Sequence, residues 1–129
     1  MERIEEIDRA ITAHGQWKNR LRAAIESGAT AFPIATIRGD EACEFGMWLF
    51  GPTFTDTERR TLDYRKTTEL HAHFHNVAGR VAELAVGGNG ADAEMLLSRD
   101  FELASEKLVA AMLVWKENIK AAIDAARRQ

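Results

Sequence analysis

The sequence has a single cysteine among its 129 residues and no secretory pattern at its start. One cysteine cannot form an internal disulfide, so its thiol must serve packing, reactivity or metal binding. The first residues, Met1–Glu6, are charged and mostly acidic, whereas a secretory signal is basic and then apolar. We therefore expect a protein of a reducing compartment, the cytoplasm.

Long hydrophobic runs and an excess of positive charge are also missing. The apolar run Leu108–Trp115 is far shorter than the roughly 20 residues that cross a bilayer. The 17 basic and 20 acidic side chains give a net charge of −3, which leaves no surplus of cations to neutralise phosphates. We therefore expect neither membrane insertion nor binding to nucleic acid.

Strand patterns are nearly absent, because no β-branched run alternates polar with apolar residues. The one exception, Phe32–Ile37, is short and contains a proline. Helical patterns are clear instead. Over Glu2–Ser27, apolar residues recur at spacings of three and four, at Ile4, Ile7, Ile11, Leu21 and Ile25. Gly28 ends this predicted helix, and Ala29–Gly39 is predicted to be a connector.

Two further helices are predicted in the middle of the chain. Asp40 is a candidate N-cap for a short helix over Glu41–Phe50. Thr55, with Glu58 three residues later, forms a capping-box pattern. Because only one glycine and no proline interrupts the residues after this box, we expect a long helix from there to about Val86.

A last helix follows a predicted loop at Gly87–Gly90. Its apolar stripe comprises Leu97, Phe101, Ala104, Leu108, Ala111, Trp115, Ile119 and Ala122, and the pattern allows a local break near Ser98–Asp100. With 46% hydrophobic residues, the chain can build one continuous core. We predict an all-α fold in one domain, residues 1–129: a four-helix bundle with three long helices and a short one. Two chains could complete the core as a homodimer.

His14 stands where the first helical pattern predicts an apolar side chain. It continues the stripe of Ile7 and Ile11 by three residues, so its imidazole should point into the bundle. A buried imidazole needs partners for both nitrogens. His14 is therefore a candidate metal ligand, and the alternative is a core histidine held by hydrogen bonds.

His71 and His75 lie four residues apart, a spacing at which two imidazoles on one helix face can reach one ion. Phe74 and the following apolar residues place that face toward the core. His73 is rotated by roughly 200° from His71, at about 3.6 residues per turn, so we exclude it from the site. The alternative is a histidine pair on an exposed helix face.

Cys43 completes the candidate site. Gly46, one turn later, removes a side chain near the thiol, which would let another helix approach closely. Three imidazoles and one thiolate form a closed tetrahedral shell, and nitrogen and sulfur ligands favour zinc over magnesium or calcium. We predict one Zn²⁺ ion bound by His14, Cys43, His71 and His75. The alternative for Cys43 is a small buried hydrophobe.

Three motifs run along the chain in order: His14-Gly-Gln-Trp17-Lys18, Cys43-Glu-Phe45-Gly46-Met-Trp48-Leu49 and Leu70-His71-Ala-His-Phe74-His75. Together they resemble the motifs of the chemoreceptor zinc-binding domain family, which is found in bacterial chemoreceptors and in some diguanylate cyclases. The resemblance implies a helical bundle, usually paired as a homodimer, with zinc held by the matching histidines and cysteine.

The resemblance also implies a function. It suggests a cytoplasmic sensory or regulatory domain of bacterial signalling, in chemotaxis or cyclic di-GMP control, which acts on an output domain or partner protein. It further implies that the Cys43 thiolate is sensitive to oxidants such as hypochlorous acid. The alternative is a zinc-stabilised helical scaffold without a sensing role. The hypothesis of a hemerythrin-like di-iron bundle has less support, because that chemistry uses more histidines and bridging carboxylates. We do not expect an enzyme, since no nucleophile beside a base and no phosphate-binding glycine loop is apparent.

Overall fold

The computed structural model describes residues 2–128 as helices joined by short loops, with no β-strand in that range. The helices are α1 (Glu2–Gly15), α2 (Trp17–Ser27), α3 (Ile34–Arg38), α4 (Glu44–Phe50), α5 (Asp56–Arg59), α6 (Leu62–Val86), α7 (Gly90–Leu96) and α8 (Glu102–Arg127). A 3₁₀ turn at Asp40–Ala42 precedes α4, and a π-helical turn at Leu97–Phe101 joins α7 to α8. The prediction of an all-α fold is confirmed, whereas the four-helix bundle, its dimerisation and the domain boundaries stay predictions.

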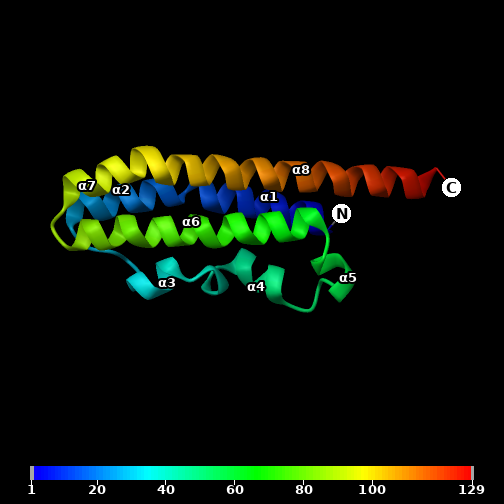
Figure 1. The fold of residues 1–129 in the computed structure, drawn as a ribbon, viewed down its shortest axis with the longest axis horizontal. Coiled ribbons are helices and arrows are strands. Elements are labelled where there is room, and N and C mark those ends of the chain that lie inside the picture. The colour runs from blue at the N-terminus through cyan, green and yellow to red at the C-terminus, as the bar shows by residue number, and fades with distance from the viewer. Residues whose placement is uncertain (1, 129) are drawn as a thin grey trace.

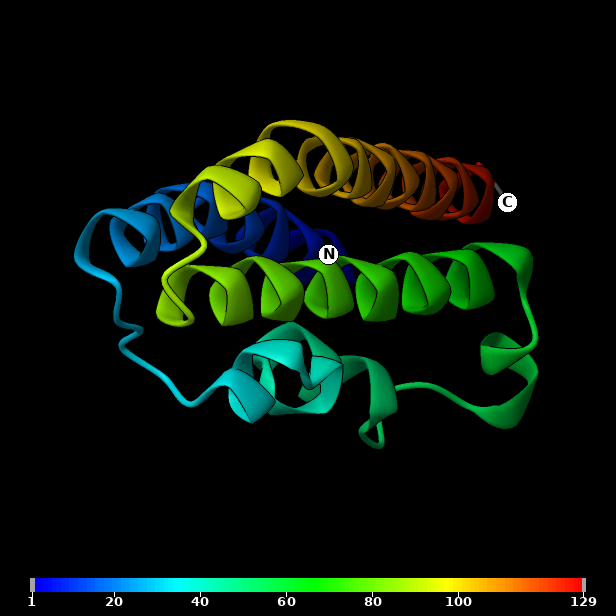
Figure 2. The same cartoon turned by 60° about the vertical axis from the view of Figure 1, so that its left-hand side comes forward.

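Three long rods run side by side: α1 with α2, α6, and α7 with α8 (Figure 1). The first rod contacts α8 through α1 and contacts α6 through α2. The short helices α3 and α4 pack along α6 on the side away from α8, as both views show (Figures 1 and 2). The last turns of α8 extend beyond the ends of the other rods (Figure 1).

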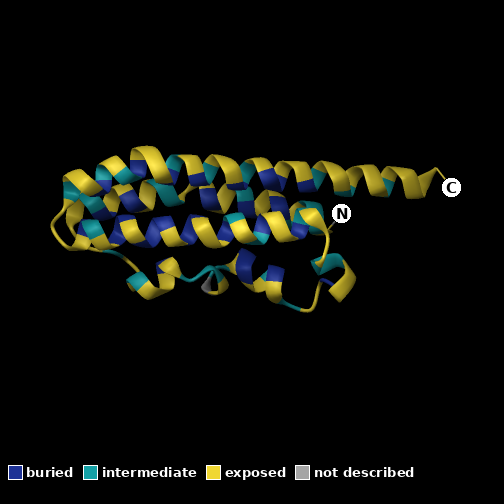
Figure 3. Cartoon of the chain, viewed as in Figure 1, coloured by how far each residue is buried: buried dark blue, intermediate teal, exposed yellow. Residues whose placement is uncertain are grey.

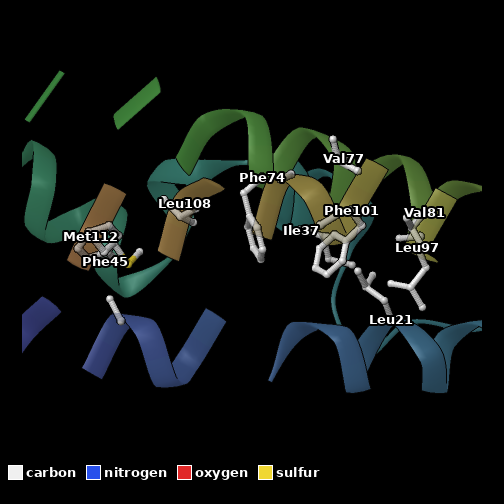
Figure 4. Close-up of a cluster of buried hydrophobic side chains, with 14 of the residues drawn as sticks. Leu21, Ile37, Phe45, Phe74, Val77, Val81, Leu97, Phe101, Leu108 and Met112 are labelled. Carbon is white, nitrogen blue, oxygen red and sulfur yellow. The ribbon is translucent and has the colours of Figure 1, made fainter. Parts of the chain in front are cut away.

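The core lies where these rods face one another, and exposed residues cover their outer sides (Figure 3). Leu21 of α2, Phe74 and Val81 of α6, and Leu97 and Phe101 of the π turn meet there (Figure 4). Fully burying a side chain of this size stabilises the fold by roughly 1.5–3 kcal/mol. Within residues 2–128, no helix combines the length and the apolar character needed to cross a membrane.

The helix predicted over residues 2–27 is interrupted at one point. Gly15, a poor helix former, ends α1. The next N–H, of Gln16, donates to Ala13 three residues back at 3.2 Å, and not four residues back as in a regular helix. Gln16 keeps a right-handed backbone, so α2 continues the rod begun by α1 (Figure 1). Gly28 ends α2 with a positive φ of 72°, as predicted.

The predicted connector contains a helix of its own, α3, which the sequence pattern did not reveal. The carbonyl of Pro33 accepts hydrogen bonds from the N–H groups of Thr36 and Ile37 at 3.0 and 3.1 Å, which starts the first turn. The strand pattern at Phe32–Ile37 therefore does not form a strand. The residues after Pro33 form a helical turn held by these local hydrogen bonds, although their sequence pattern weakly favours a strand.

The short helix predicted over Glu41–Phe50 is right in its end but wrong in its start. Asp40 is not the N-cap, because residues 40–42 form the 3₁₀ turn. Cys43 takes an extended conformation, with φ −82° and ψ 144°, and is the N-cap residue of α4. The chain turns at Cys43 because α4 packs directly on the backbone of Asp40.

The capping box is confirmed, but it starts only the short helix α5. The N–H of Glu58 donates to the Thr55 hydroxyl at 3.1 Å, and the N–H of Thr55 donates to the Glu58 carboxylate at 3.0 Å. The long helix begins later than predicted, at Leu62, because Thr61 is extended and serves as a second N-cap. It ends at Val86, as predicted.

The break allowed near Ser98–Asp100 is a π-helical turn within an otherwise continuous rod. Such a turn holds one more residue than a regular helical turn and changes the direction of the side chains beyond it. Phe101, at the end of the turn, points into the core, where its ring centre lies 5.0 Å from that of Phe74 (Figure 4).

Candidate metal centre

Three histidines and the cysteine, far apart in sequence, meet in one cluster. His14 lies in the last turn of α1, Cys43 lies directly before α4, and the pair His71 and His75 lies in the middle of α6. Their ligand atoms all lie within 4.8 Å of one another. The three imidazoles are at most 2% exposed, whereas Cys43 is partly exposed. The structure therefore brings all four predicted residues together.

The spacing of the four donor atoms resembles a tetrahedral metal shell. The Nε2 atom of His71 lies 3.1 Å from Nε2 of His14 and 3.1 Å from Nε2 of His75. The Sγ atom of Cys43 lies 3.6 Å from Nε2 of His71 and 3.8 Å from Nε2 of His14. Zinc–nitrogen bonds of about 2.0–2.1 Å and zinc–sulfur bonds of about 2.3 Å imply tetrahedron edges of roughly 3.3 and 3.6 Å. The donor set and its spacing therefore fit zinc.

Backbone carbonyls fix the orientation of two of the rings. Nδ1 of His14 lies 2.7 Å from the carbonyl oxygen of Ala10, and Nδ1 of His75 lies 2.9 Å from that of Ile37. A carbonyl only accepts, so each Nδ1 carries the proton and donates it. Each Nε2 is then left with a lone pair that faces the cluster. This arrangement of an outer hydrogen bond and an inner lone pair is typical of metal-binding histidines.

His71 differs from the other two rings. Its Nε2 faces both of the other Nε2 atoms, but its Nδ1 is buried and has no hydrogen-bond partner among residues 2–128. If Nε2 of His71 donated its proton to His75, the lone pair of His14 would be left with only the weak S–H donor of Cys43, 3.8 Å away. A cation at the centre of the cluster would satisfy all three Nε2 atoms at once.

Burial lowers the pKa of every histidine in the cluster. Loss of hydration brings the pKa of His14 down to about 4, although its hydrogen bond to Ala10 acts in the opposite direction. The pKa of His71 falls to about 2, because repulsion from the charged forms of His75 and His14 adds to burial. Burial also lowers the pKa of His75. The three rings are therefore neutral at pH 7, which is the form that binds metal.

Two opposing effects act on the pKa of the Cys43 thiol. Burial raises its pKa, and the backbone N–H groups of Gly46 and Phe45 at the start of α4 partly offset that rise. The thiol is therefore protonated at neutral pH in the absence of a cation. A metal ion deprotonates a coordinating thiol, so metal binding at this cluster would release a proton from Cys43.

Aromatic rings enclose the imidazoles. Phe74 meets His14 and His75 edge-on, with ring centres 5.0 and 5.4 Å apart. Phe45 lies 5.8 Å from His14 and 5.2 Å from His71, again edge-on. These apolar rings hold the imidazoles in place and keep water away from their donor atoms, which strengthens electrostatic interactions inside the cluster.

Gly46 allows a close approach beside Cys43, but the approaching group is not the one we predicted. The sequence suggested that a second helix would come close. Instead, a Cβ built on Gly46 would lie 1.7 Å from the carbonyl oxygen of Asp40, in the 3₁₀ turn before Cys43. The missing side chain therefore lets the chain fold back on itself and so places the thiol.

Sequence reasoning missed the two carbonyl groups that orient the rings. Ala10 lies four residues before His14 on the same helix, so helical spacing could have indicated this contact. Ile37 lies in a separate segment, and a backbone carbonyl carries no residue-type signal, so nothing in the sequence marked it. His73 is exposed and lies outside the cluster, as predicted.

Comparison with known proteins agrees with this geometry. The model of the chemoreceptor zinc-binding domain family matches residues 14–82. This chain belongs to that family. The matched range contains all four residues of the cluster, from His14 to His75. Chemoreceptor zinc-binding domains are sensory domains and not a catalytic family. Among curated proteins and solved structures, none matches the chain.

Gly46→Ala is predicted to displace Cys43 from the cluster of this chemoreceptor zinc-binding domain. The new Cβ would collide with the backbone of Asp40, so the turn before α4 must shift and carry the thiol with it. Zinc affinity, measured by competition with a chromophoric chelator, should fall at least about tenfold. Gly90→Ala is the control, because its Cβ would only touch Ile25 at 3.9 Å. Equal affinities of the two variants would contradict this role of Gly46.

The zinc-free domain is predicted to lose stability as the pH falls from 7 to 5. Unfolded histidines have a pKa near 6.5, whereas His14 has a pKa of about 4 in the fold. The unfolded state therefore binds more protons in this range, and the free energy of unfolding falls with the pH. For His14 alone the loss is about 2 kcal/mol at pH 5. Urea denaturation at several pH values measures it. A flat profile in the parent chain would refute the prediction.

Proposed function

We propose that this chain binds one zinc ion through His14, Cys43, His71 and His75 and works as a sensory domain in bacterial signalling. The observation that carries the proposal is the convergence of three Nε2 atoms and one sulfur at nearly tetrahedral spacing. Zinc bound there would supply the positive charge that keeps Cys43 as a thiolate and satisfies the buried imidazoles.

The four residues connect three separate parts of the chain. His14 belongs to the first rod, whereas His71 and His75 are held rigidly within α6. Cys43 lies between α3 and α4, and the carbonyl of Ile37 in α3 holds the ring of His75. The segment from α3 to α4 lies along the outside of α6 (Figure 2), where α3 packs closely on α6 and α4 contacts it less. A change at Cys43 should therefore alter the position of this segment first.

Oxidation of Cys43 is the refinement that we propose for the signal. Cys43 is the partly exposed donor of the cluster, and it lines a cavity of about 270 Å³ together with Trp17, Arg20 and Phe32. A small oxidant such as hypochlorous acid could therefore reach its sulfur. In the balanced step, the thiolate takes the oxygen and proton of hypochlorous acid to become a sulfenic acid, and chloride leaves. A sulfenic acid is a weaker ligand, so the segment before α4 would be released.

We further infer that the domain works in the cytoplasm as a homodimer and acts on an output domain or a partner protein, in chemotaxis or in cyclic di-GMP control. A groove of about 520 Å³, lined by the first turns of α6 and by residues 107–114 of α8, supports the formation of a homodimer. Leu62 and Val114, both more than half exposed, line it. Exposed apolar side chains gathered at one groove mark a protein contact, and a second copy of the chain is the expected occupant.

Native mass spectrometry tests the ligand set and the pairing together. The parent chain should carry one zinc ion per chain as a dimer. Alanine substitution of His14, His71 or His75 should remove or weaken zinc binding, because each lost donor is fully buried and water has no access to replace it. Cys43→Ala should weaken binding and need not abolish it, since water can replace the thiolate.

His73→Ala is the matched control for the histidine variants, and it should keep its zinc. Full zinc retention in all three cluster variants would overturn the proposed site. A folded, zinc-loaded monomer at micromolar concentration would refute the homodimer without affecting the site.

Hydrogen exchange of zinc-loaded, zinc-free and hypochlorite-treated protein separates a sensor from a structural scaffold. A sensor should lose exchange protection across residues 34–50 in the zinc-free and the hypochlorite-treated protein, while the core of α8 stays protected. Fragmentation of the peptide that contains Cys43 should place one added oxygen on the Cys43 sulfur, separately from any oxygen on the exposed Met47. In a Cys43→Ser variant, hypochlorite should cause no further loss of protection across residues 34–50. Changes confined to the ligand residues would favour the scaffold, and an unmodified thiol at doses that oxidise ordinary proteins would exclude oxidant sensing.

A further inference from the structure

Two buried polar atoms in α6 have no hydrogen-bond partner among residues 2–128, and their residues lie one helical turn apart. One is Nδ1 of His71, and the other is the hydroxyl oxygen Oγ1 of Thr67. Both side chains are fully buried, at 0% exposure. A buried polar group without a partner costs roughly 1–3 kcal/mol, so two such groups side by side call for an explanation.

The hydroxyl of Thr67 is unusual for a threonine in a helix. Such hydroxyls commonly donate to a backbone carbonyl one turn back. Thr12 does so in α1, where its hydroxyl donates to Asp8 at 3.2 Å, and Thr68 donates to Arg65 at 2.9 Å. Thr67 makes no such bond within the described chain, so its oxygen is available as an acceptor.

Helix geometry places Thr67 on the side of His71 where an acceptor is needed. Residues four apart lie on one face, and helical side chains lean toward the N-terminal turn, so the ring of His71 leans over Thr67. The Nε2 atom of that ring faces the cluster, which leaves Nδ1 on the outer edge. His14 and His75 each have a carbonyl oxygen at the corresponding position.

We propose that Thr67 is the positioning residue for His71, with its hydroxyl oxygen accepting the Nδ1–H of the ring. The two atoms are not bonded to each other in this structure, so the bond requires their side chains to turn toward each other on the helix face that they share. The bond would fix the tautomer that presents an unprotonated Nε2 to the metal, as the carbonyls of Ala10 and Ile37 do for the other rings. The inference rests on the proposed zinc site and adds a residue to it.

Zinc affinity of Thr67→Val and Thr67→Ser, measured by chelator competition, tests this inference. Valine matches threonine in shape but has no acceptor, so we expect affinity to fall about 10- to 100-fold. Serine keeps the hydroxyl, so its affinity should stay within about threefold of the parent. Thr68→Val is the matched control, because it loses a hydroxyl at the next position, and its affinity should not change.

Nuclear magnetic resonance of the zinc-loaded proteins gives a second readout. In the parent and in Thr67→Ser, the Nδ1 proton of His71 should appear as a slowly exchanging signal, whereas in Thr67→Val it should exchange faster and shift upfield. If the parent binds zinc but Thr67→Val has the same zinc affinity and an unchanged His71 Nδ1 signal, the proposed role of Thr67 is wrong. The zinc site would still stand. An equal fall in zinc affinity in Thr67→Ser and Thr67→Val would also contradict the role of Thr67, because serine keeps the hydroxyl. A parent chain that binds no zinc would instead overturn the proposed function.

Discussion

Three neutral imidazoles whose lone pairs face one another, in a part of the core nearly closed to solvent, impose the main physical constraint on this fold. His14 and His75 already use their only protons on backbone carbonyls, so their inner nitrogens can only accept. Protonating any of the rings would place a charge in an apolar space, which burial opposes. A cation with four short bonds would resolve the conflict, and the residues around the cluster hold the donor atoms in position for one.

The constraint also explains why the neighbouring packing is so aromatic. Burying a leucine contributes roughly 1.5–3 kcal/mol relative to leaving it exposed, whereas a buried imidazole nitrogen without a partner costs stability, so the cluster makes the metal-free domain weaker than an apolar helical core. Phe74 and Phe45 offset part of that loss through edge-on contacts with the imidazoles. Phe101 supports Phe74 from the π turn, which joins the cluster to the third rod. A ligand that binds only the folded state restores stability by mass action, so zinc bound at the cluster would be thermodynamically coupled to folding.

The site was predictable from the sequence to the extent that it follows from helical periodicity and residue type. The apolar stripe directed His14 inward, and the four-residue spacing joined His71 to His75 and excluded His73. Periodicity reports only the local pattern of residues along a helix, however, and cannot show where contacts with other parts of the chain interrupt that helix. The break at Gln16, the N-cap at Thr61 and the turn at Cys43 were therefore missed or misplaced. The carbonyl of Ile37 and the hydroxyl of Thr67 were missed because their roles depend on neighbours and orientation.

The hydrogen bond from His75 to α3 has a consequence for regulation that can be stated without knowing the partner. The carbonyl of Ile37 belongs to a short helix outside the three rods, so α3 and the metal site share one contact. Linkage is reciprocal: whatever factor zinc contributes to the affinity of a molecule that binds α3, that molecule contributes the same factor to the affinity for zinc. An output partner docked on this helix would therefore set the zinc concentration at which the domain responds, and one chain could have different thresholds in different assemblies.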